Sequence, residues 1–189
     1  MKICVYAASG RELHEDYFKA AQALGRAIAL GGHSLVFGGG NEGLMGACAR
    51  GVLSEGGEII GIAPRFFDEP GVLFKECSSF IYTETMRERK QLMEQQADAF
   101  IMLPGGIGTF EEFFEILTLK QLGRHSKPIA ILNTRGYYEP MLAMLRFTAE
   151  EKFMSAKCLE LFRLCNEPQE AVLHCAGQEE LRGSIRRLL

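Results

Sequence analysis

Residues 99–122 read AFIMLPGGIGTFEEFFEILTLKQL, and this stretch decides the fold. Its first part, Ala99–Leu103, is an unbroken apolar run that predicts a strand buried on both faces. Three glycines then allow a sharp turn, and Thr109 is the expected N-cap of a helix over Phe110–Leu122. A buried strand that runs through a glycine-rich turn into a helix is typical of α/β proteins with a parallel sheet.

The same alternation of apolar runs and helical periods extends in both directions from this stretch. Apolar runs predict further strands over residues 3–7, 34–37, 58–63, 80–82, 128–132 and 161–165. Helical periods predict helices over residues 15–30, 42–54, 85–97, 138–151 and 167–175, with an irregular segment at 65–79. We therefore expect an α/β fold, a single doubly wound Rossmann-like domain over residues 1–189 with a mainly parallel sheet. The basic tail at residues 182–189 is expected to fray.

The composition bounds the class of protein. With 189 residues, of which 47% are hydrophobic and 24% charged, the chain can bury a core without disulfides or metals. Its net charge of −3 disfavours nucleic acid as a partner. No run approaches the ~20 apolar residues that cross a membrane, so no membrane association is expected. The first residues lack the features of a signal peptide, and we expect a cytoplasmic protein.

The cysteines and histidines predict no metal or disulfide site, and the glycines give the stronger signal. The six cysteines contain no C-x-x-C pair and are expected to be reduced and mostly buried. The four histidines lack the spacing of metal ligands, so no metal site is expected. The chain has 21 glycines, against roughly 13 at the usual ~7%. Eight of them lie in two loops, each of which follows a predicted strand.

The first glycine-rich loop, residues 38–46, reads GGGNEGLMG. Gly38, Gly40 and Gly43 fit the G-x-G-x-x-G pattern of NAD-binding proteins. The loop follows the second strand, however, and Glu58, the acidic residue expected ~20 positions later, begins a strand instead of ending one. An NAD(P) oxidoreductase is therefore disfavoured. The loop either makes a tight turn or brings bare backbone close to a nucleotide or a sugar phosphate.

The second glycine-rich loop, Pro104–Thr109, leads into a helix whose first N–H groups attract anions, phosphate above all. It lacks the lysine of a Walker P-loop. Glu112, three residues after Thr109, fits a capping box. The helix is apolar on nearly all sides, which indicates burial or an interface, and a carboxylate there is either structurally satisfied or poised for chemistry. The spacing leaves both interpretations open.

A third motif, Thr85–Lys90, opens another predicted helix. Arg89 shares a largely apolar stripe with Met86 and Met93. An arginine there needs an anion, either a carboxylate of the protein or a ligand phosphate. Its neighbour Lys90 fits a solvated face.

Together these motifs resemble one known family. The segments P-G-G-x-G-T-x-x-E at 104–112, M-R-x-R-K at 86–90 and G-G-G-x-x-G-L-M-G at 38–46 match the "Lonely guy" family of cytokinin riboside 5′-monophosphate phosphoribohydrolases. Q-L-G-x-H-x-K-P at 121–128 and N-x-x-G-Y-Y at 133–138 follow its pattern as well. The resemblance covers most of the chain and weakens after about residue 150. Many such sequences have carried the label "lysine decarboxylase", for which these residues give no physical support.

The resemblance implies hydrolysis of the N-glycosidic bond of an adenosine 5′-monophosphate, N6-substituted in the cytokinin-activating type, to a free base and ribose 5-phosphate. The resemblance implies no metal or redox cofactor. It does imply a homodimer with the site near the subunit interface. Arg89 and Glu112 are the implied catalytic residues, Glu112 to stabilise an oxocarbenium-like transition state and Arg89 to position the substrate. The implied substrate- and phosphate-binding residues are Ser9, Gly39, Gly40, Gly43, Met45, Lys90, Gly105, Gly106, Ile107, Gly108, Thr109, Glu111 and Thr118.

The chain also departs from the family's pattern at several positions. Ala7 and Ala8 stand where Cys-Gly is usual, Arg87 where His is common, and Leu119 where Trp is usual. These departures bear on which base is released more than on glycosidic cleavage. The alternative function is a non-catalytic nucleotide-binding carrier or sensor protein, which would bind a nucleotide and leave its base attached.

Overall fold

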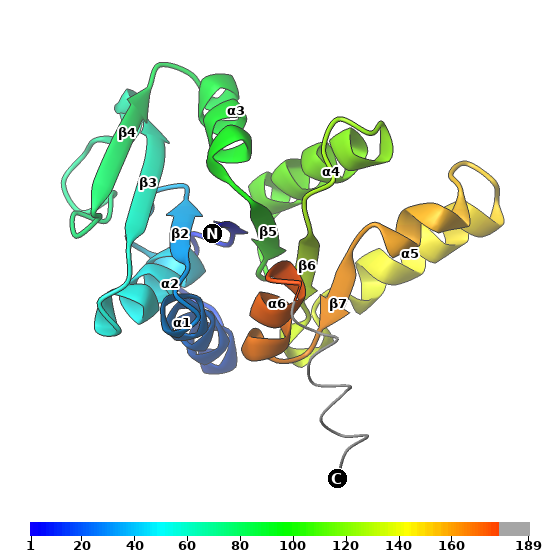
Figure 1. The fold of residues 1–189 in the computed structure, drawn as a ribbon, viewed down its shortest axis with the longest axis horizontal. Helices are drawn as coiled ribbons and strands as arrows, with labels where there is room; N and C mark the ends of the chain where they lie inside the picture. The colour runs from blue at the N-terminus through cyan, green and yellow to red at the C-terminus, as the bar shows by residue number, and fades with distance from the viewer. Residues whose placement is uncertain (178–189) are drawn as a thin grey trace, which may run out of the picture.

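The apolar runs form one sheet in the computed structural model, which describes residues 1–177 (Figure 1). Within these residues seven strands lie in the order β4-β3-β2-β1-β5-β6-β7, and every neighbouring pair is parallel. The strands are β1 (Lys2–Tyr6), β2 (Ser34–Phe37), β3 (Ile59–Pro64), β4 (Ser79–Thr83), β5 (Ala99–Met102), β6 (Ile129–Leu132) and β7 (Arg163–Cys165). The α-helices are α1 (Glu15–Leu30), α2 (Gly43–Ser54), α3 (Met86–Gln96), α4 (Ile107–Gln121), α5 (Glu139–Glu150) and α6 (Pro168–Cys175). The predicted α/β fold with a parallel sheet is confirmed; the expected tail at 182–189 lies outside the described residues.

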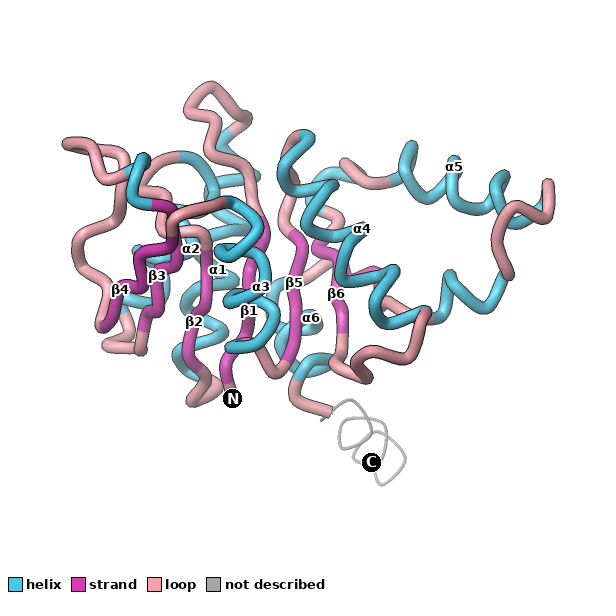
Figure 2. Tube along the Cα trace, turned by 90° about the horizontal axis from the view of Figure 1, so that it is seen from above, coloured by secondary structure: helices cyan, strands magenta, loops and turns pink. Residues whose placement is uncertain are grey.

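Helices cover both faces of the sheet, because successive side chains of a strand point to opposite faces. In β1, Ile3 and Val5 pack into a core with residues of α1, α2 and α6. Cys4 and Tyr6 of the same strand pack into a second core with residues of α3, α4 and α5. Figure 2 shows helices on both sides of the strands. Burial on both faces explains why the strands are continuous apolar runs in the sequence.

The direction in which the sheet grows reverses beside β1. From β1 the chain builds outwards through β2, β3 and β4, and then returns to place β5 on the other side of β1. Ligands of such folds bind in the crevice outside the carboxyl ends of the strands at this switch point. The loops after β1, β2 and β5 meet there. The N–H of Ala8 donates to the carbonyl of Pro104 at 3.1 Å, and the N–H of Leu44 donates to the carbonyl of Ala8 at 2.9 Å.

The start of α4 differs from the prediction. The helix begins at Ile107 with Gly106 as N-cap, so the prediction that Thr109 is the N-cap is wrong. Gly106 has extended backbone angles (φ −93°, ψ −154°) and no side chain to cap with. Glycine is accepted at the N-cap position without a side-chain hydrogen bond, and such a helix start leaves no sequence signal of its own.

Two other expectations also need correction. Residues 65–79 are not wholly irregular, because Arg65–Phe67 form a short 3₁₀ helix and Leu73 bridges to Gly40. Of the two interpretations of α4, burial on all sides is wrong, because Glu111, Glu115 and Thr118 are exposed, while an interface stays a prediction. The sheet covers one face of the helix and leaves this polar face open.

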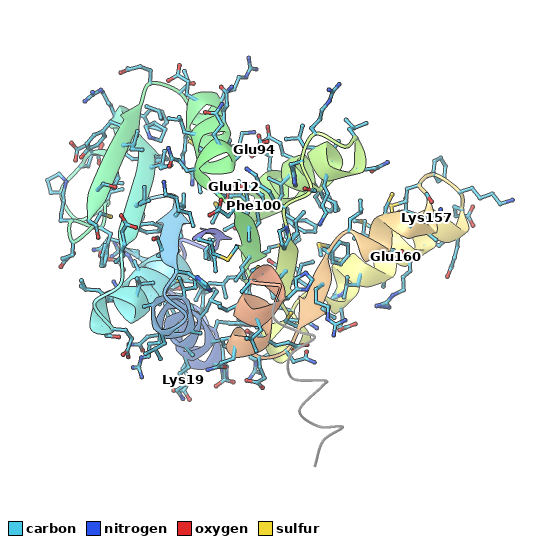
Figure 3. All side chains as sticks on the ribbon, viewed as in Figure 1. Lys19, Glu94, Phe100, Glu112, Lys157 and Glu160 are labelled. Carbon is cyan, nitrogen blue, oxygen red and sulfur yellow. The ribbon has the colours of Figure 1, made fainter. Side chains whose placement is uncertain are left out.

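α5 and the segment after it extend away from the body of the molecule (Figure 1). Figure 3 shows Lys157 and Glu160 on this arm, well away from Glu112 at the centre. The arm exposes three large apolar side chains: Met144 at 52%, Phe147 at 61% and Phe153 at 85% exposure. An apolar surface of this kind marks a site of interaction more often than free solvent-facing surface.

Candidate active site

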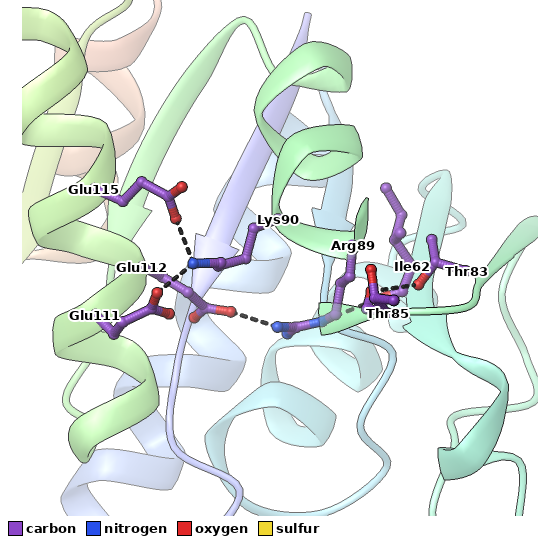
Figure 4. Close-up of polar contacts among 8 residues, drawn as sticks. All are labelled: Ile62, Thr83, Thr85, Arg89, Lys90, Glu111, Glu112 and Glu115. Atoms are coloured by element: carbon purple, nitrogen blue, oxygen red, sulfur yellow. Dashed lines mark hydrogen bonds and ion pairs between the residues drawn. The ribbon is translucent and has the colours of Figure 1, made fainter. Parts of the chain in front are cut away.

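The carboxylate of Glu112 meets the guanidinium of Arg89 across the gap between α4 and α3 (Figure 4). Nη1 of Arg89 donates to Oε1 of Glu112 at 2.7 Å, and Nε donates to the carbonyl of Ile62 at 3.3 Å. Both charged side chains are 9% exposed. The carboxylate is bonded to Arg89, and the N-cap is Gly106, so of the two interpretations of Glu112 the capping box is wrong. The anion that Arg89 requires is a carboxylate of the protein.

The environment of Glu112 favours its protonated form more than water does. Burial raises the pKa of Glu112 above its ordinary value, while the charge and the hydrogen bond of Arg89 act against that rise. Burial also raises the pKa of the nearby Cys4 and Tyr6, so both stay neutral at physiological pH. A carboxylate with a raised pKa beside a cavity is a candidate for proton transfer.

Lys90 forms a second link between the two helices. Its Nζ contacts Oε1 of Glu111 and lies 2.8 Å from Oε2 of Glu115, so one ammonium group joins two carboxylates of α4 (Figure 4). The Lys90 side chain is 19% exposed, so the interpretation that it lies on a solvated face is wrong. Consecutive residues of α3 therefore bind consecutive carboxylates of α4.

The glycine-rich loop after β2 makes room for Arg89. A Cβ at Gly38 would overlap the guanidinium of Arg89, so any larger residue there would force that side chain to shift. Gly43 has a φ of +60°, and a Cβ there would collide with the backbone of the first loop at Ala8 and Ser9. The N–H groups of Leu44 and Met45 donate to the Ala8 carbonyl. The start of α2 is thus occupied by protein.

The start of α4 is available to a ligand instead. Gly106, Ile107 and Gly108 are exposed, and the N-cap supplies no side-chain partner. The first N–H groups of a helix have no acceptor within the helix, and the helix dipole adds a positive potential there. This end of α4 is the part of the described site best suited to an anion such as a phosphate.

These groups line a cavity of about 860 Å³ at the switch point. It is bounded by the loops after β1, β2, β3, β5 and β6. Of the residues predicted from the sequence, the cavity lining includes Ser9, Gly40, Met45, Arg89, Gly105, Gly106, Ile107, Gly108, Thr109, Glu111 and Glu112. Most of the predicted set therefore converges on one cavity from four separate segments of the chain.

Four predicted residues do not line this cavity: Gly39, Gly43, Lys90 and Thr118. Gly39 and Gly43 instead allow the loop to turn, with φ values of +75° and +60°. Lys90 is held by its two carboxylates. Thr118 is exposed farther along α4. A direct contact of these four with a nucleotide remains a prediction.

The predicted set of site residues omits several lining residues, among them Leu13, Tyr17, Phe67, Met86 and Tyr137. Phe67 belongs to the segment that was expected to be irregular. Tyr137 follows β6, and the rule that ligands bind beyond the carboxyl ends of strands, applied to β6 as well, would have found it. The aromatic and aliphatic residues of this set give the cavity an apolar wall.

The structure agrees with the argument against an NAD-type site, because Glu58 precedes β3 at the amino end of the sheet and accepts a hydrogen bond from Ser34. Within residues 1–177 no group of three or more His, Cys, Asp and Glu side chains is arranged to hold a metal ion. Among the same residues no helix is long and apolar enough to span a membrane.

Comparison with known proteins gives concordant matches. A family model described as "possible lysine decarboxylase" matches residues 45–175. A probable cytokinin riboside 5′-monophosphate phosphoribohydrolase of Oryza sativa subsp. japonica is 39% identical over 160 residues, which cover 85% of this chain and 72% of that protein. A cytokinin riboside 5′-monophosphate phosphoribohydrolase of Rhodococcoides fascians is 39% identical over 157 residues, covering 82% and 79%. One of Arabidopsis thaliana is 38% identical over 155 residues, covering 82% and 73%.

Solved structures share the fold at lower identity. The molybdenum cofactor binding protein of Rippkaea orientalis superposes with a TM-score of 0.68 at 23% identity, covering 97% of this chain and 96% of that one. The molybdenum cofactor carrier protein of Chlamydomonas reinhardtii gives 0.68 at 23% identity, covering 96% and 98%. At this identity the likeness extends to the fold alone.

Proposed function

The chain belongs to the family of cytokinin riboside 5′-monophosphate phosphoribohydrolases, and we propose that it hydrolyses the N-glycosidic bond of a nucleoside 5′-monophosphate at the cavity described above. The observation that carries this proposal is the buried pair of Arg89 and Glu112 beside the uncapped start of α4. One end of this arrangement suits a phosphate, and the carboxylate at the other end suits the positive charge that a reacting sugar develops.

The proposed reaction consumes one water. The bond between C1′ and the base nitrogen breaks, and its electron pair goes to the base. The water oxygen bonds to C1′, and one water proton finally resides on the base, which leaves a free base and ribose 5-phosphate. The sugar passes through an oxocarbenium-like state, and the Glu112 carboxylate stabilises this positive charge and orients the water. Arg89 holds Glu112 in place and balances its charge.

The cavity suits the two ends of such a substrate. The start of α4, with Gly106 and Gly108 exposed, receives the 5′-phosphate through backbone N–H groups. The apolar wall of the cavity includes Leu13, Phe67 and Met86. A flat base with an apolar substituent would pack against this wall. An N6-substituted adenosine 5′-monophosphate has both features.

A substrate panel tests the proposal. AMP, N6-isopentenyl-AMP, GMP and CMP are incubated separately with the protein, and the free base and ribose 5-phosphate are separated by chromatography. We expect equal amounts of the two products, with the N6-substituted nucleotide cleaved fastest. Nucleotide that stabilises the protein but keeps its base after long incubation would instead identify a carrier or sensor.

We further propose that the protein is a cytoplasmic homodimer that uses the arm for association. Met144 and Phe147 lie one helical turn apart on α5, and Phe153 follows on the same arm, all exposed. A second copy of the chain would cover these side chains. None of the six cysteines, all of which lie within the described residues, forms a disulfide, as expected in a reducing compartment.

A further inference from the structure

Among the described residues that line the cavity, the one buried cation, Arg89, is already bonded to a carboxylate. The two cations of this lining are arginines, and each faces a carboxylate. Nε of Arg11 lies 3.5 Å from Oε2 of Glu42, and Nη1 of Arg89 lies 2.7 Å from Oε1 of Glu112. The Arg11 side chain is 73% exposed, so its pair with Glu42 is a weak surface contact. The groups held in place for a 5′-phosphate are therefore the backbone N–H groups of the loop before α4, and their directions depend on how its peptide planes are oriented.

One side chain of the cavity wall fixes such a plane. The hydroxyl of Tyr137 donates a hydrogen bond to the carbonyl of Gly105 at 2.8 Å, across 32 residues of sequence. The described chain has no cis peptide bond, so the N–H of Gly106 points opposite to that carbonyl. The bond to Tyr137 therefore fixes the direction of this N–H as well. The residues on both sides of this peptide, Gly105 and Gly106, have no Cβ to restrain its rotation. The hydrogen bond from the Tyr137 hydroxyl therefore supplies the restraint.

Tyr137 is itself held in one position. Its ring packs edge-on against Tyr17 of α1, with ring centres 5.9 Å apart and an angle of 81° between the planes. The turn before it is closed by Asn133, whose Oδ1 accepts from the N–H of Tyr138 at 2.8 Å. Arg135, in the same turn, takes a φ of +57° that few residues other than glycine adopt. A side chain presented by so constrained a turn has little freedom to lose when a ligand binds.

We propose that Tyr137 is a positioning residue for the 5′-phosphate, acting through the Gly105–Gly106 peptide. This inference rests on the proposed function for the identity of the ligand. It gives a role to the N-x-x-G-Y-Y segment at 133–138, which the catalytic pair does not use. The same hydrogen bond couples the loop after β6 to the loop after β5, so the phosphate site depends on a strand that supplies no other part of it.

The test compares Tyr137→Phe with the wild type by isothermal titration with ribose 5-phosphate and by kinetics with AMP. Loss of one hydrogen bond should raise the Kd of ribose 5-phosphate and the KM of AMP by about threefold to tenfold. The kcat should stay within about twofold, because Glu112 and Arg89 are untouched. Binding of adenosine, which lacks the phosphate, should be unchanged. Tyr82→Phe, which removes a hydroxyl outside the cavity lining, is the matched control.

The outcomes separate this inference from the proposed function. If the wild type binds ribose 5-phosphate and Tyr137→Phe binds it equally well, the inference is wrong whether or not AMP is cleaved. A loss that affects adenosine as much as ribose 5-phosphate would also overturn it, because it would indicate a contact with the sugar or base. If the wild type binds ribose 5-phosphate yet leaves the base on every nucleotide of the panel, the proposed function fails instead.

Discussion

Gly38 lies directly under the guanidinium of Arg89, so that a Cβ at position 38 would overlap Nη2 of that side chain. Gly38→Ala should therefore displace Arg89 from Glu112, lower the free energy of unfolding by about 1–3 kcal/mol and remove most of the activity. Gly108→Ala is the control for stability, because open space surrounds its position and alanine is favoured in a helix. Urea denaturation of both variants checks this. Equal stability of the two variants would contradict the packing described for Gly38.

Removing one partner of the Arg89–Glu112 ion pair should destabilise the protein, mainly because the other charge is then buried without a partner. Arg89→Met leaves a buried carboxylate without its partner and should cost about 3–5 kcal/mol of unfolding free energy. The double variant Arg89→Met/Glu112→Gln removes both charges and should recover much of that loss while staying inactive. Chemical denaturation at neutral pH measures both. A double variant no more stable than Arg89→Met would contradict this account.

The raised pKa of Glu112 predicts where activity falls on acidification. If the carboxylate is the working form, kcat/KM should decrease as pH falls through the pKa of Glu112, at a pH above the ordinary glutamate value of 4.5. Glu111 raises this pKa, and Lys90 lowers it. Glu111→Gln should therefore shift the acidic limb to lower pH, and Lys90→Met to higher pH. Shifts in the reverse directions would contradict the assignment of the limb to Glu112.

The exposed apolar side chains of the arm predict where two copies associate. Phe153→Glu and Phe147→Glu place a charge on side chains that are 85% and 61% exposed, and each should convert a dimer to a monomer. Leu30→Glu, at 74% exposure at the end of α1, is the control and should remain dimeric. Sedimentation velocity measures the three. A wild-type monomer, or dimers that survive both arm variants, would rule out this interface.

The sequence predicted the fold because burial on both faces makes each strand a continuous apolar run, and glycines mark where the strands end. It also predicted that Arg89 requires an anion. It did not identify Glu112 as that anion, since the pairing depends on α3 and α4 being brought together by the return of the chain from β4 to β5.

Two other features left weaker signals in the sequence. Gly106 begins α4 without a capping side chain, so Thr109 was the more conspicuous candidate. Tyr137 reaches the site only because β6 lies beside β5, and its hydrogen bond to Gly105 spans elements that are far apart in the sequence. Pairwise contacts of this kind are set by tertiary packing, and single-sequence patterns do not encode them.

The most direct test of the account is release of the base from N6-isopentenyl-AMP by the wild type and by Glu112→Gln. We expect the wild type to yield equal amounts of free base and ribose 5-phosphate. Glu112→Gln should remain folded and be at least about 100-fold slower. Glu115→Gln, a carboxylate of the same helix outside the cavity lining, should stay within about twofold of the wild type. Intact nucleotide after prolonged incubation with the wild type, or full activity in Glu112→Gln, would contradict the account.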